Sequence, residues 1–155
     1  MSIIGWYYLH TNGDLIYKRD LDGAAADIRE SDFTRAMWPI GPEDREGAWN
    51  ILVEACALGA MPTRIHDLAE KWHCDESDID TYAQRLGVKL EMDGNAWCAT
   101  GPNFKDLVIS PAGFGPSKFL AMVELCKALG YPGGRMWNHT FKSLLEAQRA
   151  KVLPV

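Results

Sequence analysis

The sequence lacks the features that place many chains in a functional class at first sight. No apolar run reaches the roughly 18 residues that a helix needs to cross a membrane, and residues 2–4 lack the basic start and apolar core of a signal peptide. No nucleotide-binding fingerprint, no Ser-His-Asp signature and no internal repeat is present. We therefore expect a soluble cytoplasmic protein, with no enzyme class indicated.

Cysteine is scarce, and its spacing argues against a zinc site. The four cysteines are Cys56, Cys74, Cys98 and Cys126. No two of them form a CxxC pair, so in a reducing compartment they are most simply buried apolar side chains. His66 and His73 would lie two turns apart on one helix face beside Cys74, but a third ligand at metal spacing is missing. The sequence predicts no metal and no cofactor, and a small hydrolase or transferase using these three residues is a third-ranked hypothesis.

The chain is acidic overall, but its charge is uneven. Among its 155 residues the net charge is −5. Residues 1–101 hold 9 Lys and Arg against 18 Asp and Glu, whereas residues 102–155 hold 7 against 3, so the two parts carry −9 and +4. Such asymmetry indicates either a basic binding surface or complementary packing of the two ends, and the scattered basic residues favour the second.

The first 41 residues are predicted to form an aromatic hairpin and a connector. In GWYYLHTNGDLIYK, Asn12-Gly13 between aromatic and β-branched residues predicts a hairpin that pairs Leu9 with Ile16 and Tyr8 with Tyr17. This run resembles one copy of the repeats in cell-wall carbohydrate and choline binders. Those modules work by repetition, so here the aromatic residues are expected to be structural. A short helix is expected near Ile28, and the prolines in residues 36–42 predict an irregular segment.

Residues 42–100 carry the strongest pattern of secondary structure. A helix is expected from Pro42 to Leu58, with Gly59 ending it. Two more helices follow from apolar positions at helical spacing: Ile65, Leu68, Ala69 and Trp72, then Ile79, Tyr82, Ala83 and Leu86. Asp75 is placed to cap the second of these, and Gly87 to close it in the left-handed conformation. A hairpin then turns at Asp93-Gly94 and would pair Leu90 with Trp97.

This order resembles a winged helix-turn-helix, through LAEKWHCDESDIDTYAQRLGV. His73 stands where that family usually has glycine in a strained turn. The residues that would face a DNA groove are Glu76, Ser77, Asp80 and Thr81. Carboxylates at these positions would repel phosphates, so the resemblance implies the fold but not the reading of DNA.

Residues 101–155 are expected to form a C-terminal helical part. Asn103 to Val108 is a short helix or strand, and the glycine-rich segment from Ser110 to Lys118 is a loop that starts a helix. A phosphate cradle is the alternative for that loop, but its spacing does not match a P-loop. Helices are expected from Ser117 to Leu129, capped by Gly130-Tyr131, and from about Trp137 to Ala150.

The whole chain resembles small uncharacterised proteins of phages and prophages of Gram-negative bacteria, through GWYYLHTNGDLIYKRDLD, DREGAWNILVEA and ELCKALGY. The resemblance implies a phage context and no activity. We expect one α+β, mostly helical domain with a winged-helix-like core, an N-terminal β-hairpin and two C-terminal helices. The first functional hypothesis is a non-enzymatic accessory protein whose acidic helix and wing bind a host or phage protein through Glu76, Asp78, Asp80 and Thr81. In its sharper form, this surface acts as a nucleic-acid mimic. The alternative is a DNA-binding regulator that uses Lys89, Arg135, Lys142, Arg149 and Lys151.

Overall fold

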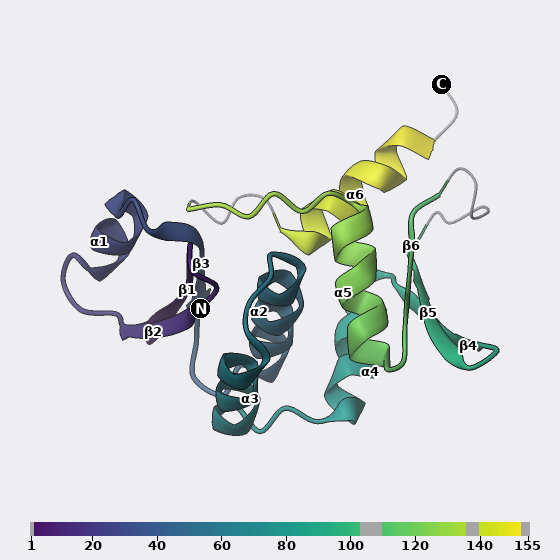
Figure 1. Cartoon of the computed structure of the whole chain (residues 1–155), viewed down its shortest axis with the longest axis horizontal. Helices are drawn as coiled ribbons and strands as arrows, with labels where there is room; N and C mark the ends of the chain where they lie inside the picture. The colour runs from purple at the N-terminus through teal and green to yellow at the C-terminus, as the bar shows by residue number, and fades with distance from the viewer. Residues whose placement is uncertain (1, 103–109, 136–139, 153–155) are drawn as a thin grey trace.

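The computed structural model describes residues 2–102, 110–135 and 140–152, with side chains up to residue 148. The described residues form six helices and two antiparallel three-stranded sheets, so the predicted α+β class is confirmed (Figure 1). The expected segment at residues 103–108 and the start of the last helix at Trp137 lie outside the described residues. The elements are β1 Gly5–His10, β2 Leu15–Arg19, α1 Ala24–Glu30, β3 Thr34–Ile40, α2 Arg45–Ala57, α3 Pro62–Lys71, α4 Glu76–Leu86, β4 Lys89–Asp93, β5 Ala96–Thr100, β6 Ala112–Gly115, α5 Lys118–Ala128 and α6 Phe141–Val152.

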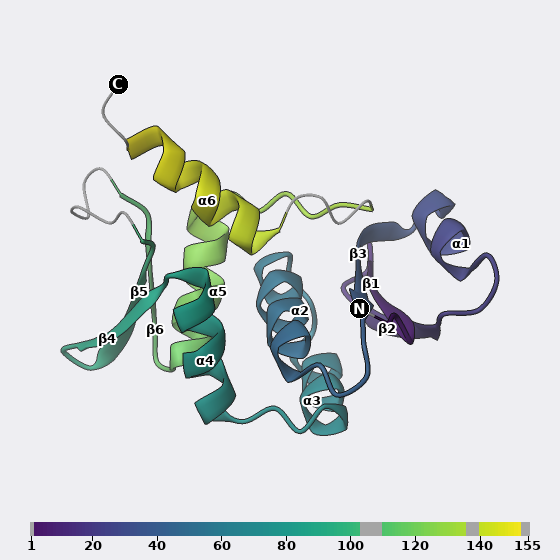
Figure 2. The same ribbon diagram turned by 180° about the vertical axis from the view of Figure 1, so that it is seen from behind.

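The two sheets lie at opposite ends of the molecule, with helices between them. The sheet β2-β1-β3 and α1 form one end, and the sheet β4-β5-β6 forms the other (Figures 1 and 2). Helix α2 lies between them and packs against α3, α4 and α5. One cluster of buried side chains runs through both ends, from Leu9 in β1 to Leu145 in α6. No helix in the described part of the chain is long and apolar enough to span a membrane.

The N-terminal hairpin is confirmed, but its predicted register is wrong by one residue. Leu9 pairs with Leu15, and Tyr8 pairs with Ile16. The turn is a three-residue loop in place of a two-residue one, because the Gly13 amide donates to the His10 carbonyl and Gly13 has a φ of 96°. A glycine in the left-handed region after such a turn is a common way to close a hairpin.

The expected irregular segment at residues 36–42 is instead mostly the strand β3, which pairs with β1. Pro39 fits because β3 is at the edge of its sheet, where a strand pairs on one side only. The Met37 amide points away from β1 and donates to the Gly134 carbonyl, 3.0 Å away. Pro39 is two residues further along, so its missing amide hydrogen faces the same outer side. The proline therefore removes no hydrogen bond to β1.

The start of α2 and both ends of α4 are set by capping residues. Helix α2 begins at Arg45 and not at Pro42, because the Asp44 side chain accepts from the Gly47 amide and sets the first turn. The predicted cap at Asp75 and the left-handed Gly87, with a φ of 75°, are confirmed. His73 has a φ of 52°, the strained conformation expected for a residue in place of glycine.

The second sheet corrects two predictions. Leu90 pairs with Ala99 and not with Trp97, because the turn lies one residue later, at Gly94-Asn95. Part of the segment expected to be a glycine-rich loop is the strand β6, which pairs with β5 and packs on α5. Side chains at Gly113 and Gly115 would overlap the α5 backbone, so these glycines allow a close approach of strand and helix. The candidate wing is thus part of a sheet that α5 covers on one face.

Helix α5 agrees with the expected C-terminal cap at Gly130-Tyr131. Ser117 caps α5 by accepting from the Leu120 amide, and the amide of the buried Tyr131 donates to the Cys126 carbonyl after a left-handed Gly130. The order of α2, α3, α4, β4 and β5 agrees with the expected order of elements. A relationship to winged-helix proteins stays a prediction.

Candidate functional site

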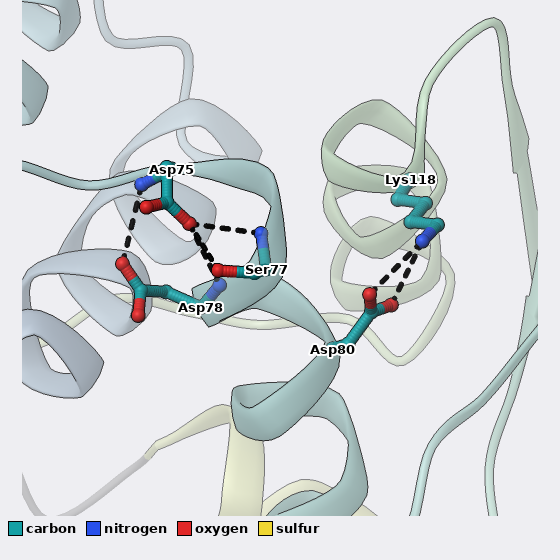
Figure 3. Close-up of polar contacts among 5 residues, drawn as sticks. All are labelled: Asp75, Ser77, Asp78, Asp80 and Lys118. Carbon is teal, nitrogen blue, oxygen red and sulfur yellow. Dashed lines mark hydrogen bonds and ion pairs between the residues drawn. The ribbon is translucent and has the colours of Figure 1, made fainter.

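The start of α4 gathers the carboxylates that the sequence singled out. Asp75 accepts hydrogen bonds from the Ser77 amide at 2.9 Å and the Asp78 amide at 3.2 Å (Figure 3). Asp78 returns the contact by accepting from the Asp75 amide at 3.2 Å, which completes a capping box. Hydrogen bonds from Ser77 and from the Asp78 amide lower the pKa of Asp75. The exposed Asp75 carboxylate therefore stays charged in mildly acidic solution.

Asp80 is paired within the chain. The Lys118 ammonium of α5 lies 3.0 Å from each oxygen of its carboxylate (Figure 3). The same ammonium lies 5.0 Å from the centre of the Trp97 ring in β5. Lys118 thus joins α4, α5 and the second sheet at one point. The Asp80 side chain is still 54% exposed, so its outer side remains accessible to another molecule.

The remaining two predicted contact residues, Glu76 and Thr81, are both exposed. Among the described residues neither has a hydrogen bond or an ion pair with another side chain. The four predicted residues therefore occupy one helix, with two of them engaged in structural contacts and two presented to solvent. Glu76 and Thr81 are therefore the two of these positions that can be changed without removing a structural contact.

The basic residues of the DNA-binding alternative are not gathered into one surface by the described contacts. Arg135 donates to the Thr34 carbonyl at 2.8 Å and to the Arg29 carbonyl at 3.4 Å, so it ties the segment before α6 to β3. Lys89 pairs with Glu91 on the same strand at 2.9 Å. Lys142 is exposed at the start of α6. The side chains of Arg149 and Lys151 lie outside the described residues.

The histidines and Cys74 show no arrangement for catalysis in the described residues. His66 and His73 are exposed, and the described residues include no group of three ligands that could hold a metal ion. Burial raises the pKa of Cys74 to about 11, with Asp78 adding to the shift. At neutral pH this thiol is protonated, and the thiolate is the nucleophilic form.

A second polar site, which sequence reasoning missed, centres on Glu54 in α2. The side chain is fully buried. Burial raises its pKa to about 7, and nearby polar groups of Tyr131, Asn50 and Trp38 together with the Phe141 backbone oppose the shift. None of these groups meets the distance and angle of a full hydrogen bond to either carboxylate oxygen. A buried carboxyl group without complete hydrogen bonding is costly and therefore uncommon.

A cleft of about 530 Å³ shares residues with the surroundings of this carboxyl group, although Glu54 itself is not part of its lining. Trp38, Asn50 and Tyr82 line the cleft and also lie near Glu54, since the first two oppose its pKa shift and Glu54 in turn raises the pKa of Tyr82. The Tyr82 hydroxyl donates to the Asn50 side-chain oxygen at 2.8 Å, which joins α4 to α2. The sequence held one signal of this site, since Glu54 is the only charged residue between Ile51 and Leu58.

Similarity to other proteins assigns no role to either site. Comparison of the chain with protein-family models, with curated proteins and with solved structures gives no significant match. The acidic start of α4 and the surroundings of Glu54 are therefore interpreted from their own geometry and charge.

Proposed function

We propose that the chain is a non-enzymatic accessory protein of the cytoplasm that binds a protein partner with a basic surface. The contact is the acidic face of α4, which we define as Asp75, Glu76, Asp78, Asp80 and Thr81, together with the hairpin β4–β5. The phage-type resemblance makes a host or phage protein the natural partner. A basic surface that normally contacts phosphates would fit this face, which makes α4 a nucleic-acid mimic.

The observation that carries the proposal is the imbalance of charge on α4. Four carboxylates lie within the first six residues from the cap, and Lys118 is the one Lys or Arg that forms an ion pair with any of them in the described part of the chain. The positive end of the helix dipole stabilises the carboxylates of the first turn. The fold therefore maintains a dense negative charge at an exposed position, where it attracts basic surfaces over roughly 8 Å at physiological salt.

The described contacts favour this proposal over a DNA-binding regulator. Arg135 and Lys89 are engaged with groups of the chain itself, and the carboxylates of α4 would repel a DNA backbone. Mixed-sequence duplex DNA titrated with the protein at low salt should give no rise in fluorescence anisotropy. Binding that weakens steeply with salt, and is lost when Arg135, Lys142 and Arg149 are neutralised, would instead establish the DNA-binding regulator.

The direct test uses the two exposed positions that hold no structural contact. Glu76→Lys and Thr81→Lys reverse or oppose the charge of α4 without removing the cap or the Asp80–Lys118 ion pair. Proteins retained from a bacterial host extract on the immobilised chain are compared with those retained on Glu30→Lys, a matched change on the exposed end of α1. We expect a partner that Glu30→Lys retains, that both α4 variants lose, and that duplex DNA displaces in competition.

Two results would contradict the proposal. One is a set of retained proteins that is the same for the α4 variants and for the α1 control. The other is a partner that is retained through α4 but is not displaced by duplex DNA. That result would rule out nucleic-acid mimicry and leave α4 as a contact surface for a protein alone.

A further inference from the structure

A groove of about 400 Å³ lies between the outer edge of β2 and helix α3. The four consecutive residues 14–17 line one side of it. Because side chains of a strand alternate between the two faces of its sheet, a cavity that touches all four lies against the edge of β2. The exposed residues Arg64, Asp67 and Lys71 of α3 line the opposite side. This volume lies within the roughly 300–1,000 Å³ of ligand sites in proteins.

The hydrogen bonds between β1 and β2 show which main-chain groups of β2 point toward solvent. At one end of the pair, the His10 amide donates to the Asp14 carbonyl at 2.8 Å. At the other end, the Asp20 amide donates to the Ile4 carbonyl at 3.1 Å. Alternate residues of an antiparallel pair bond to the partner strand, so the even-numbered residues of β2 face β1. The main-chain groups of the odd-numbered residues therefore point away from the sheet.

Two residues of β2 present accessible main-chain groups along this outer edge. Leu15 points outward but is buried, whereas Tyr17 is half-buried and Arg19 is exposed. The Arg19 carbonyl accepts from the Leu21 amide at 2.9 Å. No described group bonds to the Tyr17 amide, the Tyr17 carbonyl or the Arg19 amide. These three groups are the donors and acceptor that another extended chain would pair with.

The chain itself begins to pair along this edge and then leaves it. The Met61 amide donates to the Gly13 carbonyl at 3.1 Å, just before β2 begins. Pro62 is the next residue and starts α3. Beyond this point one side of the groove is a helix and the other is an unpaired strand edge. An extended peptide that adds a strand to an exposed sheet edge is a recurring form of peptide recognition.

The charges around the groove favour an acidic peptide. The basic residues Arg64 and Lys71 line the groove, Arg19 lies at the free edge, and two carboxylates complete the lining. This local excess of positive charge stands out in a chain whose net charge is −5. The Lys71 ammonium lies 3.6 Å from the centre of the Tyr17 ring, so one positive charge is held next to the free edge. Arg64 has no ion pair in the described part of the chain.

We propose that this groove binds an acidic, extended segment of a partner protein, which adds to the first sheet as a strand beside β2. Its main chain pairs with Tyr17 and with the Arg19 amide, and its carboxylates lie toward Arg64 and Lys71. The inference is independent of the proposed function. The groove shares no residue with the acidic face of α4, and the two surfaces take partners of opposite charge.

A short peptide of alternating glutamate and valine with blocked ends is a suitable probe, because β-branched residues favour the extended conformation. Its titration into the full chain, followed by amide chemical shifts, should give a Kd of about 1 mM. Binding should slow hydrogen exchange at the Tyr17 and Arg19 amides. The Ile16 and Lys18 amides face β1 and should exchange slowly with and without the peptide.

Two control peptides separate main-chain pairing from charge. The same peptide with methylated main-chain nitrogens keeps its carboxylates but has no N–H group to donate to the edge. A peptide of alternating lysine and valine keeps these donors and reverses the charge. Each should bind this groove about tenfold more weakly than the glutamate peptide. Equal affinity for the methylated peptide would overturn the proposal.

A matched pair of variants tests the charge of the groove. Arg64→Glu should weaken binding of the glutamate peptide about fivefold. Lys127→Glu makes the same change of charge at an exposed position of α5 and should leave the Kd within about twofold, since screening confines such effects to nearby charges. Equal losses in the two variants would contradict the proposal. So would unchanged exchange at the Tyr17 amide on saturation, or no binding at about 10 mM peptide.

Discussion

At the scale of single residues, Glu54 is a carboxyl group whose protonation depends on folding within the physiological pH range. Its pKa rises from 4.5 to about 7, chiefly through burial. The unfolded chain therefore releases this proton at lower pH than the folded chain does. The stabilising effect of the proton is complete below about pH 4.5 and is lost as the pH rises to about 7.

This linkage gives the first prediction. A shift of this size corresponds to about 3 kcal/mol in the free energy of unfolding between pH 4.5 and pH 8. Glu54→Gln carries no titratable group, so urea denaturation should show a smaller loss of stability over this pH range than in the natural chain. Glu124→Gln should keep the natural profile. Parallel profiles for Glu54→Gln and the natural chain would mean that Glu54 titrates normally.

Asp75 carries a second prediction at this scale. Asp75→Ala removes the acceptor of two amide hydrogen bonds and should lower the urea midpoint of unfolding. Asp75→Asn retains an acceptor without the charge, and asparagine caps helices about as well as aspartate. Urea midpoints should therefore place the asparagine variant close to the natural chain. Similar losses in both variants would assign the effect to charge and not to capping.

At the scale of elements, the contact of β6 with α5 depends on two glycines. A Cβ atom at Gly113 would overlap the backbone of Ala121 and Leu125. Neither backbone can move without breaking the sheet or the helix. These glycines were predicted from the sequence to lie in a loop, because a glycine-rich run is compatible both with a loop and with a strand that packs closely against a helix.

Gly113→Ala should accordingly lower the free energy of unfolding by about 1–3 kcal/mol or more, the usual cost of overpacking. Gly134→Ala is the matched control, since its Cβ would meet open space and its φ is not in the left-handed region. Thermal unfolding followed by circular dichroism would compare the two. An unaffected Gly113→Ala would show that strand and helix are further apart than described.

At the scale of the whole molecule, one buried cluster connects the two sheets through α2. Leu52 lies at the middle of α2 and is 1% exposed. Leu52→Ala should lower the free energy of unfolding by about 2–5 kcal/mol, and both ends of the molecule should lose stability together. Tryptophan fluorescence and far-ultraviolet circular dichroism should then give coincident urea transitions.

The control for this prediction is Leu21→Ala, since Leu21 is 62% exposed and lies outside the buried clusters. It should leave the free energy of unfolding within about 0.5 kcal/mol of the natural value. Separate transitions for the two probes in Leu52→Ala would show that the ends of the molecule unfold independently.

Much of the secondary structure could be predicted from residues close together in the chain. Asp75, Ser117 and Gly87 act within one helical turn, and Asn12-Gly13 acts within one hairpin, so their effects are visible in the sequence. The exposed carboxylates of Glu76 and Asp80 were likewise identifiable from helical spacing. The pairing register was missed by one residue in the N-terminal hairpin and by two residues in the second hairpin, because the final turn geometry depends on the strands that flank it.

The sequence by itself determined the caps, the amphipathic helices and the acidic start of α4, because each depends on contacts within a few residues. Only the tertiary structure decided that Pro39 lies in an edge strand, that Gly113 lies under α5 and that Lys118 meets Asp80. It also decided that Glu54 is buried, although its neighbours Asn50, Tyr82 and Tyr131 are spread over three segments. Such contacts join residues far apart in the chain, and their energies appear only when the core excludes water from between them.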